Sequence, residues 1–129
     1  MNPTPCKPLV YIASPYTKGD PAINTSFQME IFHQLFDEGL VYPVAPLMSH
    51  FLHLYRPRSY VDWIDYDLAI LARCDALLRL NPNYPYLNYI VTESSGATLE
   101  IARAKGLGLP VFYARNTLNA WANERKAKP

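Results

Sequence analysis

The chain has little cysteine and no long hydrophobic run. Its two cysteines, Cys6 and Cys74, are too few for a disulfide framework and lack the spacing of metal ligands. No stretch approaches the roughly 18 apolar residues of a membrane span, and Met1–Pro8 holds three prolines without the apolar core of a signal peptide. We therefore expect a cytoplasmic protein without a membrane partner, in which Cys74 is a packed thiol.

The chain also lacks a charge excess and a glycine-rich phosphate loop. Its formal net charge is +1, which excludes the strongly basic surface typical of proteins that bind a nucleic acid polymer. The loop after the first apolar run has neither the dinucleotide-binding nor the P-loop pattern of glycines, which disfavours NAD and ATP. With 129 residues, half of them apolar, we expect one domain over residues 1–129 that acts on a small molecule.

Short apolar runs alternate with segments of helical spacing. We predict strands at 9–13, 40–44, 76–80 and 109–113. We predict helices that begin at Asn24 or Thr25 and end at Gly39, that run from the Ser59 cap to about Arg73, that run from Gly96 to Lys105, and that begin near Thr117. Residues 45–58 are expected to form a pocket wall with one helical turn, and residues 81–89 a loop.

This alternation predicts the α/β class. Strand–helix–strand units give a parallel sheet covered on both faces, so we expect a flavodoxin-like or Rossmann-like three-layer sandwich with four to five strands. Ligands in such folds bind beyond the carboxyl ends of the strands. The expected site therefore includes the loop 14–24, the segment 81–93 with the helix start after it, and the stretch after Val44.

The predicted third helix carries the first candidate chemistry. Ser94, Ser95 and Gly96 lie at its amino terminus, where free N–H groups and the helix dipole favour an anion. Glu100 follows about one turn later, and a carboxylate there can attack an anomeric carbon. The alternative is a solvated helix glutamate behind a serine cap.

Other candidates lie on the segments around the expected cleft. Asp67, in an otherwise apolar helix, can bind sugar hydroxyls or orient the nucleophile, although a solvated face is the alternative. His50 can line a base-binding pocket or donate a proton. The His50–His53 spacing lacks the glutamate of a zincin motif, so we expect no metal. The candidates for substrate contacts from the first loop and from the aromatic side chains are Ser14, Tyr16 and Trp63.

Three segments together resemble the nucleoside 2-deoxyribosyltransferase-like superfamily. They are Tyr11-Ile12-Ala13-Ser14-Pro15-Tyr16, then Asp67 with Cys74-Asp75-Ala76-Leu77, and then Ser94-Ser95-Gly96-Ala97-Thr98-Leu99-Glu100 followed by Gly108-Leu109-Pro110-Val111. Within the superfamily the chain is most similar to short bacterial and phage members. The resemblance extends over roughly residues 9–113.

The resemblance implies a covalent mechanism at an N-glycosidic bond. It implies that Glu100 attacks C1′, that Tyr11 assists Glu100, and that Asp67 binds the sugar or orients the nucleophile. It implies no organic cofactor, and a homodimer or higher homo-oligomer whose active sites are completed across subunits. The transferases carry an aspartate where this chain has Ser94, and the relatives that hydrolyse nucleoside 5′-monophosphates carry a serine, which favours hydrolysis over base exchange. The first loop, however, lacks the Arg and Gly-Gly run of those hydrolases, and Lys18 is its only substitute.

Two further hypotheses remain at this stage. The chain can be a nucleotide-binding or sensing module without catalysis, because a fold does not determine a function. It can also be an interaction protein that uses its tyrosine-rich loop as an interface. Base release from a nucleoside or nucleotide separates the enzyme that cleaves an N-glycosidic bond from both alternatives.

Overall fold

The protein is an α/β sandwich with a parallel central sheet. The computed structural model describes residues 7–84, 89–90 and 95–127. Its elements, in chain order, are β1 (Leu9–Ala13), α1 (Pro21–Glu38), β2 (Tyr42–Val44), η1 (Pro46–Met48), α2 (Ser49–Tyr55), α3 (Tyr60–Leu71), β3 (Ala76–Arg79), β4 (Asn83–Tyr84), β5 (Tyr89–Ile90), α4 (Ser95–Gly106), β6 (Val111–Phe112) and α5 (Arg115–Ala127).

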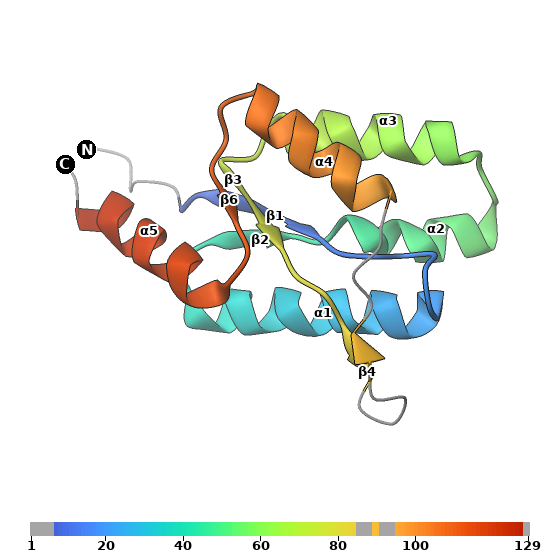
Figure 1. The fold of residues 1–129 in the computed structure, drawn as a ribbon, viewed down its shortest axis with the longest axis horizontal. Coiled ribbons are helices and arrows are strands. Elements are labelled where there is room, and N and C mark those ends of the chain that lie inside the picture. The colour runs from blue at the N-terminus through green and yellow to red at the C-terminus, as the bar shows by residue number, and fades with distance from the viewer. Residues whose placement is uncertain (1–6, 85–88, 91–94, 128–129) are drawn as a thin grey trace.

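The four-stranded sheet has the order β2-β1-β3-β6, and all its neighbours pair in parallel. Helices α3 and α4 cover one face and α1 covers the other (Figure 1). This confirms the expected flavodoxin-like three-layer fold with four strands in the main sheet. The chain passes from β1 outward to β2 and then returns to β3 on the other side of β1. Strand order therefore reverses between β1 and β3, where ligands of such sheets bind.

The alternation of side chains along β1 separates two cores. Val10 and Ile12 are fully buried in a core that includes Ile31 and Leu35 of α1 and also side chains of α5. Tyr11 and Ala13 point to the opposite face, against α3 and α4. Because both faces of β1 are covered, its sequence reads as a continuous apolar run. Tyr11 is therefore placed under α4, the helix that carries Glu100.

Helix α1 begins earlier than the sequence pattern indicated. Asp20 is its N-cap, since Asp20 Oδ1 accepts from the backbone N–H of Ala22 at 2.9 Å and of Ile23 at 3.2 Å, and Pro21 occupies the first helical position. The expectation that Asn24 caps this helix is wrong. Asn24 is buried inside the helix, and its Nδ2 donates to the carbonyl oxygens of Tyr16 and Lys18, which holds the loop after β1.

Two other segments contain more structure than expected. Residues 45–58 form η1 and the seven-residue helix α2 instead of a single helical turn. The predicted loop at 81–89 contains β4, which pairs with β5 in a small antiparallel sheet. The short strands escaped the sequence pattern because two paired residues have too few side chains to show a period. The Ser59 cap and the Gly39 terminus are confirmed, the latter with a φ of 75° that favours glycine.

Within residues 7–84, 89–90 and 95–127, no helix combines the length and the apolar character of a membrane-spanning segment.

Candidate active site

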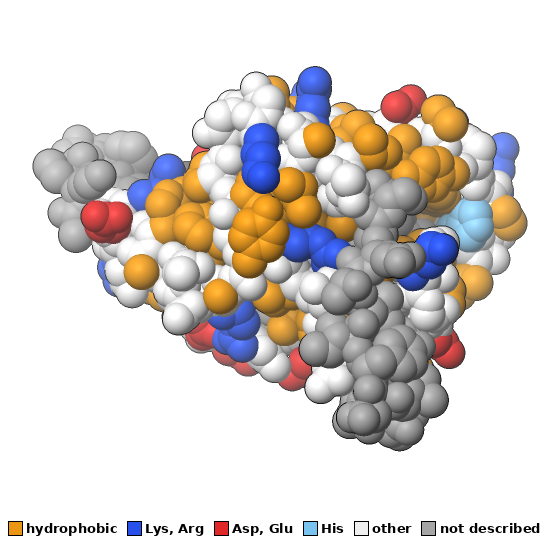
Figure 2. Space-filling model, in the orientation of Figure 1, with side chains coloured by type: hydrophobic (Ala, Val, Ile, Leu, Met, Phe, Trp, Pro, Cys, Tyr) orange, Lys and Arg blue, Asp and Glu red, His pale blue; other side chains and the backbone are white. Residues whose placement is uncertain are grey.

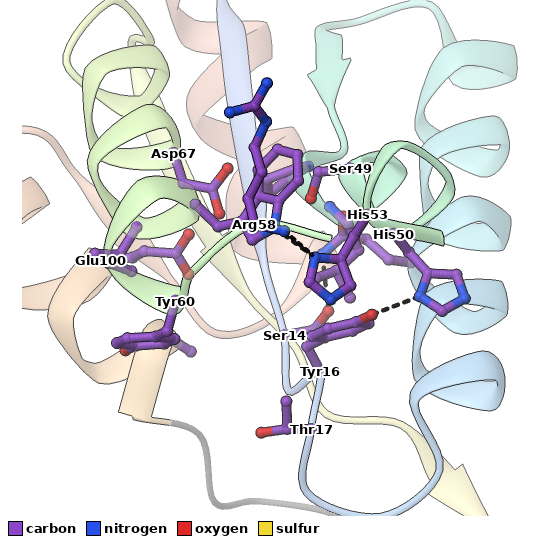
Figure 3. Close-up of a pocket in the computed structure, with 17 residues that line it drawn as sticks. Ser14, Tyr16, Thr17, Ser49, His50, His53, Arg58, Tyr60, Asp67 and Glu100 are labelled. Atoms are coloured by element: carbon purple, nitrogen blue, oxygen red, sulfur yellow. Dashed lines mark hydrogen bonds between the residues drawn. The ribbon is translucent and has the colours of Figure 1, made fainter. Parts of the chain in front are cut away.

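A cavity of about 240 Å³ lies beyond the carboxyl end of β1. Its walls come from the loop after β1, from α1, from the η1–α2 segment, and from α3 and the start of α4 (Figure 3). The carboxyl groups of Asp67 and Glu100 lie on one side of it, and the rings of His53, His50 and Tyr16 lie on the other. The cavity therefore places two carboxyl groups opposite a group of aromatic and imidazole rings.

Glu100 is a buried carboxyl group in the wall of this cavity. Its residue is 5% exposed, and the hydroxyl of Tyr11 donates a hydrogen bond to Glu100 Oε2. Tyr11 reaches it from β1, which lies beneath α4, so the contact joins residues 89 positions apart. Glu100 therefore lines the cavity as a buried carboxyl group held by one hydroxyl donor, unlike the solvated helix glutamate of the alternative.

Asp67 stands beside Glu100 and points into the same space (Figure 3). It comes from α3, which begins at the Ser59 cap, where Ser59 Oγ accepts from the backbone N–H of Asp62 at 3.1 Å. Asp67 Oδ1 is buried and has no hydrogen-bond partner among the described residues. A buried polar atom without a partner costs about 1–3 kcal/mol, so a ligand hydroxyl at this point would stabilise the site.

Burial dominates the electrostatics of the two carboxyl groups. The pKa of Glu100 is raised to about 8, mainly by desolvation and also by the nearby charge of Asp67, whereas the Tyr11 hydrogen bond and the Arg79 charge oppose the rise. Desolvation also raises the pKa of Asp67 to about 7. The pKa of Tyr11 is raised well above its ordinary value, first by burial and then by the charges of Glu100 and Asp67. Tyr11 thus keeps its proton and donates a hydrogen bond to Glu100 Oε2.

A buried glutamine of α1 hydrogen-bonds to β1, to the loop after it and to the η1 segment. Gln28 of α1 is fully buried, and its Nε2 donates to Ile12 O at 3.1 Å and to Ser14 Oγ at 2.9 Å. Its Oε1 accepts from the backbone N–H of Leu47 at 2.8 Å. Because Gln28 donates to the Ser14 hydroxyl, the Ser14 proton remains available to a ligand in the cavity. Gln28 therefore fixes both Ser14 and the η1 segment.

The opposite wall consists of linked aromatic and imidazole rings. Trp63 Nε1 donates to His53 Nδ1 at 2.9 Å. The Tyr16 hydroxyl and His50 Nδ1 form a second hydrogen bond, with the two rings edge to face. Tyr60 lines the same cavity. Such walls are suited to a flat, partly polar ligand.

The structure brings the residues singled out in the sequence to one place. Ser14, Tyr16, His50, Trp63, Asp67, Gly96 and Glu100 all line the cavity, and Tyr11 contacts Glu100 from behind. Ser94, singled out as a substrate contact, lies outside the described residues. Within the described part of the chain, no group of three or more His, Cys, Asp or Glu side chains is arranged to hold a metal ion.

Several lining residues were missed by sequence reasoning. They are Gln28, Ser49 and Arg58. Gln28 had a signal, since it occupies the buried stripe of α1 together with Asn24, Ile31 and Leu35. A polar residue at an apolar position of a helix indicates a buried hydrogen-bond network. The others lie in loops or near helix starts, where no period shows which side chains point inward.

Fold and site together define an α/β protein of flavodoxin-like architecture with a carboxyl pair in its cleft. Compared with models of known protein families, the chain matches none, and a search among curated proteins likewise finds no match.

Proposed function

We propose that this protein cleaves the N-glycosidic bond of a nucleoside or a nucleoside 5′-monophosphate through a covalent glycosyl–Glu100 intermediate. The observation that carries the proposal is the Glu100 carboxyl group, which is buried, lines the cavity and receives the Tyr11 hydrogen bond. The resemblance to the nucleoside 2-deoxyribosyltransferase-like superfamily supports it from the sequence side.

In the proposed first step Glu100 Oε attacks C1′ of the sugar. The bond between C1′ and the base breaks, its electron pair leaves with the base, and the new ester holds the sugar on Glu100. Water then attacks C1′, the ester bond to Glu100 breaks and restores the carboxylate, and the attacking water gives up a proton to solvent as the free sugar leaves. We propose hydrolysis over transfer to a second base, on the strength of the serine at position 94.

Asp67 is proposed to bind the sugar. Its buried Oδ1 lacks a partner and faces the cavity beside Glu100, so a ribosyl hydroxyl there would satisfy it. The base is proposed to lie against Trp63, Tyr60 and the rings of the opposite wall. Gly96, in the first turn of α4, leaves room at a helix amino terminus that favours the phosphate of a 5′-monophosphate.

The direct test is base release from a panel of substrates. The purified protein would be incubated with ribonucleosides, 2′-deoxyribonucleosides and their 5′-monophosphates, and free base would be followed by chromatography. Release from at least one member supports the proposal, and the ratio of phosphorylated to free substrate shows whether phosphate is bound. If no member loses its base while one of them binds saturably, the protein is a nucleotide-binding module.

The rate of base release is expected to depend on pH through Glu100. The attacking group must be ionised, and burial raises the pKa of Glu100 to about 8, so kcat/KM should rise with pH through neutrality, pass its midpoint near pH 8 and level off at higher pH. The Asp67 charge contributes to that raised pKa. Asp67→Asn should therefore move the midpoint of the profile to lower pH, whatever it does to the plateau.

Asp65→Asn is the matched control for this profile, because Asp65 is exposed on the same helix. It should leave the midpoint where it is in the wild type. A kcat/KM that falls steadily as pH rises from 6 to 8, or an unmoved midpoint in Asp67→Asn, would contradict this account of the nucleophile.

We propose that the protein forms a homo-oligomer, with support from an exposed apolar surface. This α2–α3 surface consists of Phe51, Leu52, Leu54, Tyr55, Tyr60, Val61 and Tyr66, each more than half exposed. Figure 2 shows apolar side chains gathered over α3 and toward α2. It adjoins the cavity through Tyr60, so a second copy there would lie next to the site.

Sedimentation equilibrium tests this expectation, with a dimer or larger species as the expected result. Leu54→Glu, at a position 66% exposed, should produce a monomer without unfolding the chain. Leu107→Glu, also exposed but outside the α2–α3 surface, should leave the assembly intact. A wild-type monomer at micromolar concentration would overturn the expectation.

A further inference from the structure

The ring of His53 is fixed by two donors on one of its edges. Trp63 Nε1 donates to His53 Nδ1 at 2.9 Å, and the backbone N–H of Arg58 donates to the same nitrogen at 3.1 Å. His53 lies on α2, whereas Arg58 precedes α3 and Trp63 belongs to it. The imidazole thus links α2 to α3 and to the segment before it (Figure 3).

These contacts determine which ring nitrogen carries the proton. A ring nitrogen accepts hydrogen bonds through its lone pair, which is present only when that nitrogen carries no proton. Nδ1 of His53 therefore bears no hydrogen. The neutral ring then carries its proton on Nε2. Nε2 makes no hydrogen bond within the described part of the chain, and the His53 side chain lines the cavity. His53, which lies across the cavity from Asp67 and Glu100 (Figure 3), therefore holds its one ring N–H in a fixed orientation.

We propose that His53 Nε2–H donates a hydrogen bond to an acceptor atom on the leaving base. This inference rests on the proposed function and assigns a donor to its bond-breaking step. As the bond between C1′ and the base nitrogen breaks, the electron pair moves onto the base while C1′ bonds to Glu100. The hydrogen bond stabilises that negative charge, His53 keeps its proton, and the departed base takes a proton from water.

The proposal selects a class of substrate. The base must offer a lone pair on an edge that is conjugated with the glycosidic nitrogen, as N7 or N3 of a purine and O2 of a pyrimidine do. His50 is less suited to this role, because its Nδ1 pairs with the Tyr16 hydroxyl, which can either donate or accept. The contacts of His50 therefore do not orient a single donor toward the base.

Turnover of two kinds of substrate tests the role of His53. The variants are His53→Leu, which removes the donor, and His53→Gln, whose amide can accept from Trp63 and still donate. His53→Leu should lower the cleavage rate of one substrate, the neutral-base nucleoside that the wild type cleaves fastest, by about 10²-fold. This is the cost of losing one transition-state donor. Nicotinamide riboside carries a positively charged pyridinium, so its base leaves uncharged and no negative charge needs the donor. Its cleavage rate should therefore change less than about threefold. His53→Gln should retain most of the activity on both substrates.

Equal losses on the two substrates would show a merely structural role and overturn the proposal. So would a His53→Leu variant with wild-type activity on the neutral-base nucleoside. Long-range ¹H–¹⁵N correlation spectra of the imidazoles supply a readout that needs no turnover. They should show the His53 proton on Nε2, and a proton on Nδ1 in the folded wild type would equally overturn the proposal.

A binding measurement separates this proposal from the function on which it rests. If the wild type releases no base from any substrate, the proposed function fails, and titration calorimetry with free adenine, hypoxanthine, uracil, cytosine and thymine still tests the donor. The best-bound base should lose about tenfold in affinity in His53→Leu and little in His53→Gln, as expected for one hydrogen bond. Unchanged affinity in His53→Leu, or no binding of any of these bases to the wild type, would overturn the assignment.

Discussion

Glu100→Gln should reduce base release by at least about 10⁴-fold, as the removal of a covalent nucleophile does in other enzymes. The amide has nearly the shape of the carboxyl group, and its oxygen can still accept from the Tyr11 hydroxyl, so the fold should remain intact. It cannot form the glycosyl ester, because an amide oxygen is a poor nucleophile. Steady-state rates and intact-mass spectrometry of quenched reactions measure the effect. The wild type should show a sugar adduct and the variant none.

Glu124→Gln is the matched control for this loss. It makes the same chemical change at an exposed position of α5, away from the cavity, and should keep wild-type kinetics. Circular dichroism of both variants would confirm that their folds are intact. A Glu100→Gln variant that retains activity within about tenfold of the wild type would rule out covalent catalysis by Glu100.

The stability of the wild type should fall as pH rises from about 4.5 to about 8. Burial raises the pKa of Glu100 from 4.5 to about 8, so in this window the folded state holds a proton that the unfolded chain has released. The unfolded state binds fewer protons, and the free energy of unfolding therefore decreases with pH. The stabilisation is fully present below pH 4.5 and is lost as pH passes the folded value. A pKa difference of one between the folded and unfolded states is worth about 1.4 kcal/mol. The difference between 4.5 and about 8 therefore amounts to a total on the order of 4–5 kcal/mol.

Glu100→Gln should abolish this part of the pH dependence. Urea unfolding between pH 5 and pH 9 should give a flatter curve for the variant, which becomes the more stable protein at the alkaline end. The difference between the two curves reports Glu100 together with its coupling to Asp67, because the remaining titrating groups are common to both proteins. Glu124→Gln should follow the wild type at every pH. Parallel curves for wild type and Glu100→Gln would mean that Glu100 is not held protonated by the fold.

Burial also explains why the sequence alone could not decide between the two readings of Glu100. The spacing that places it one turn into a helix is the same for a solvated glutamate and for a buried one. The choice depends on Tyr11 and Asp67, which are 89 and 33 positions away and reach Glu100 from other elements. For His53, likewise, the metal spacing could be judged from the sequence, whereas the Trp63 contact that sets its tautomer could not.

The sequence by itself determined the class of fold, several helix ends and the edge of the sheet where the cavity lies. These follow from local chemistry: apolar runs bounded by turn residues, a serine cap at Ser59 and a glycine terminus at Gly39. Only the tertiary structure decided that Tyr11 touches Glu100, that Gln28 holds Ser14, and that the carboxyl pair is desolvated. The physical reason is that capping and periodicity act within a few residues of the chain. Burial and hydrogen bonding across the cavity depend on side chains that become neighbours only when the sheet and its helices pack.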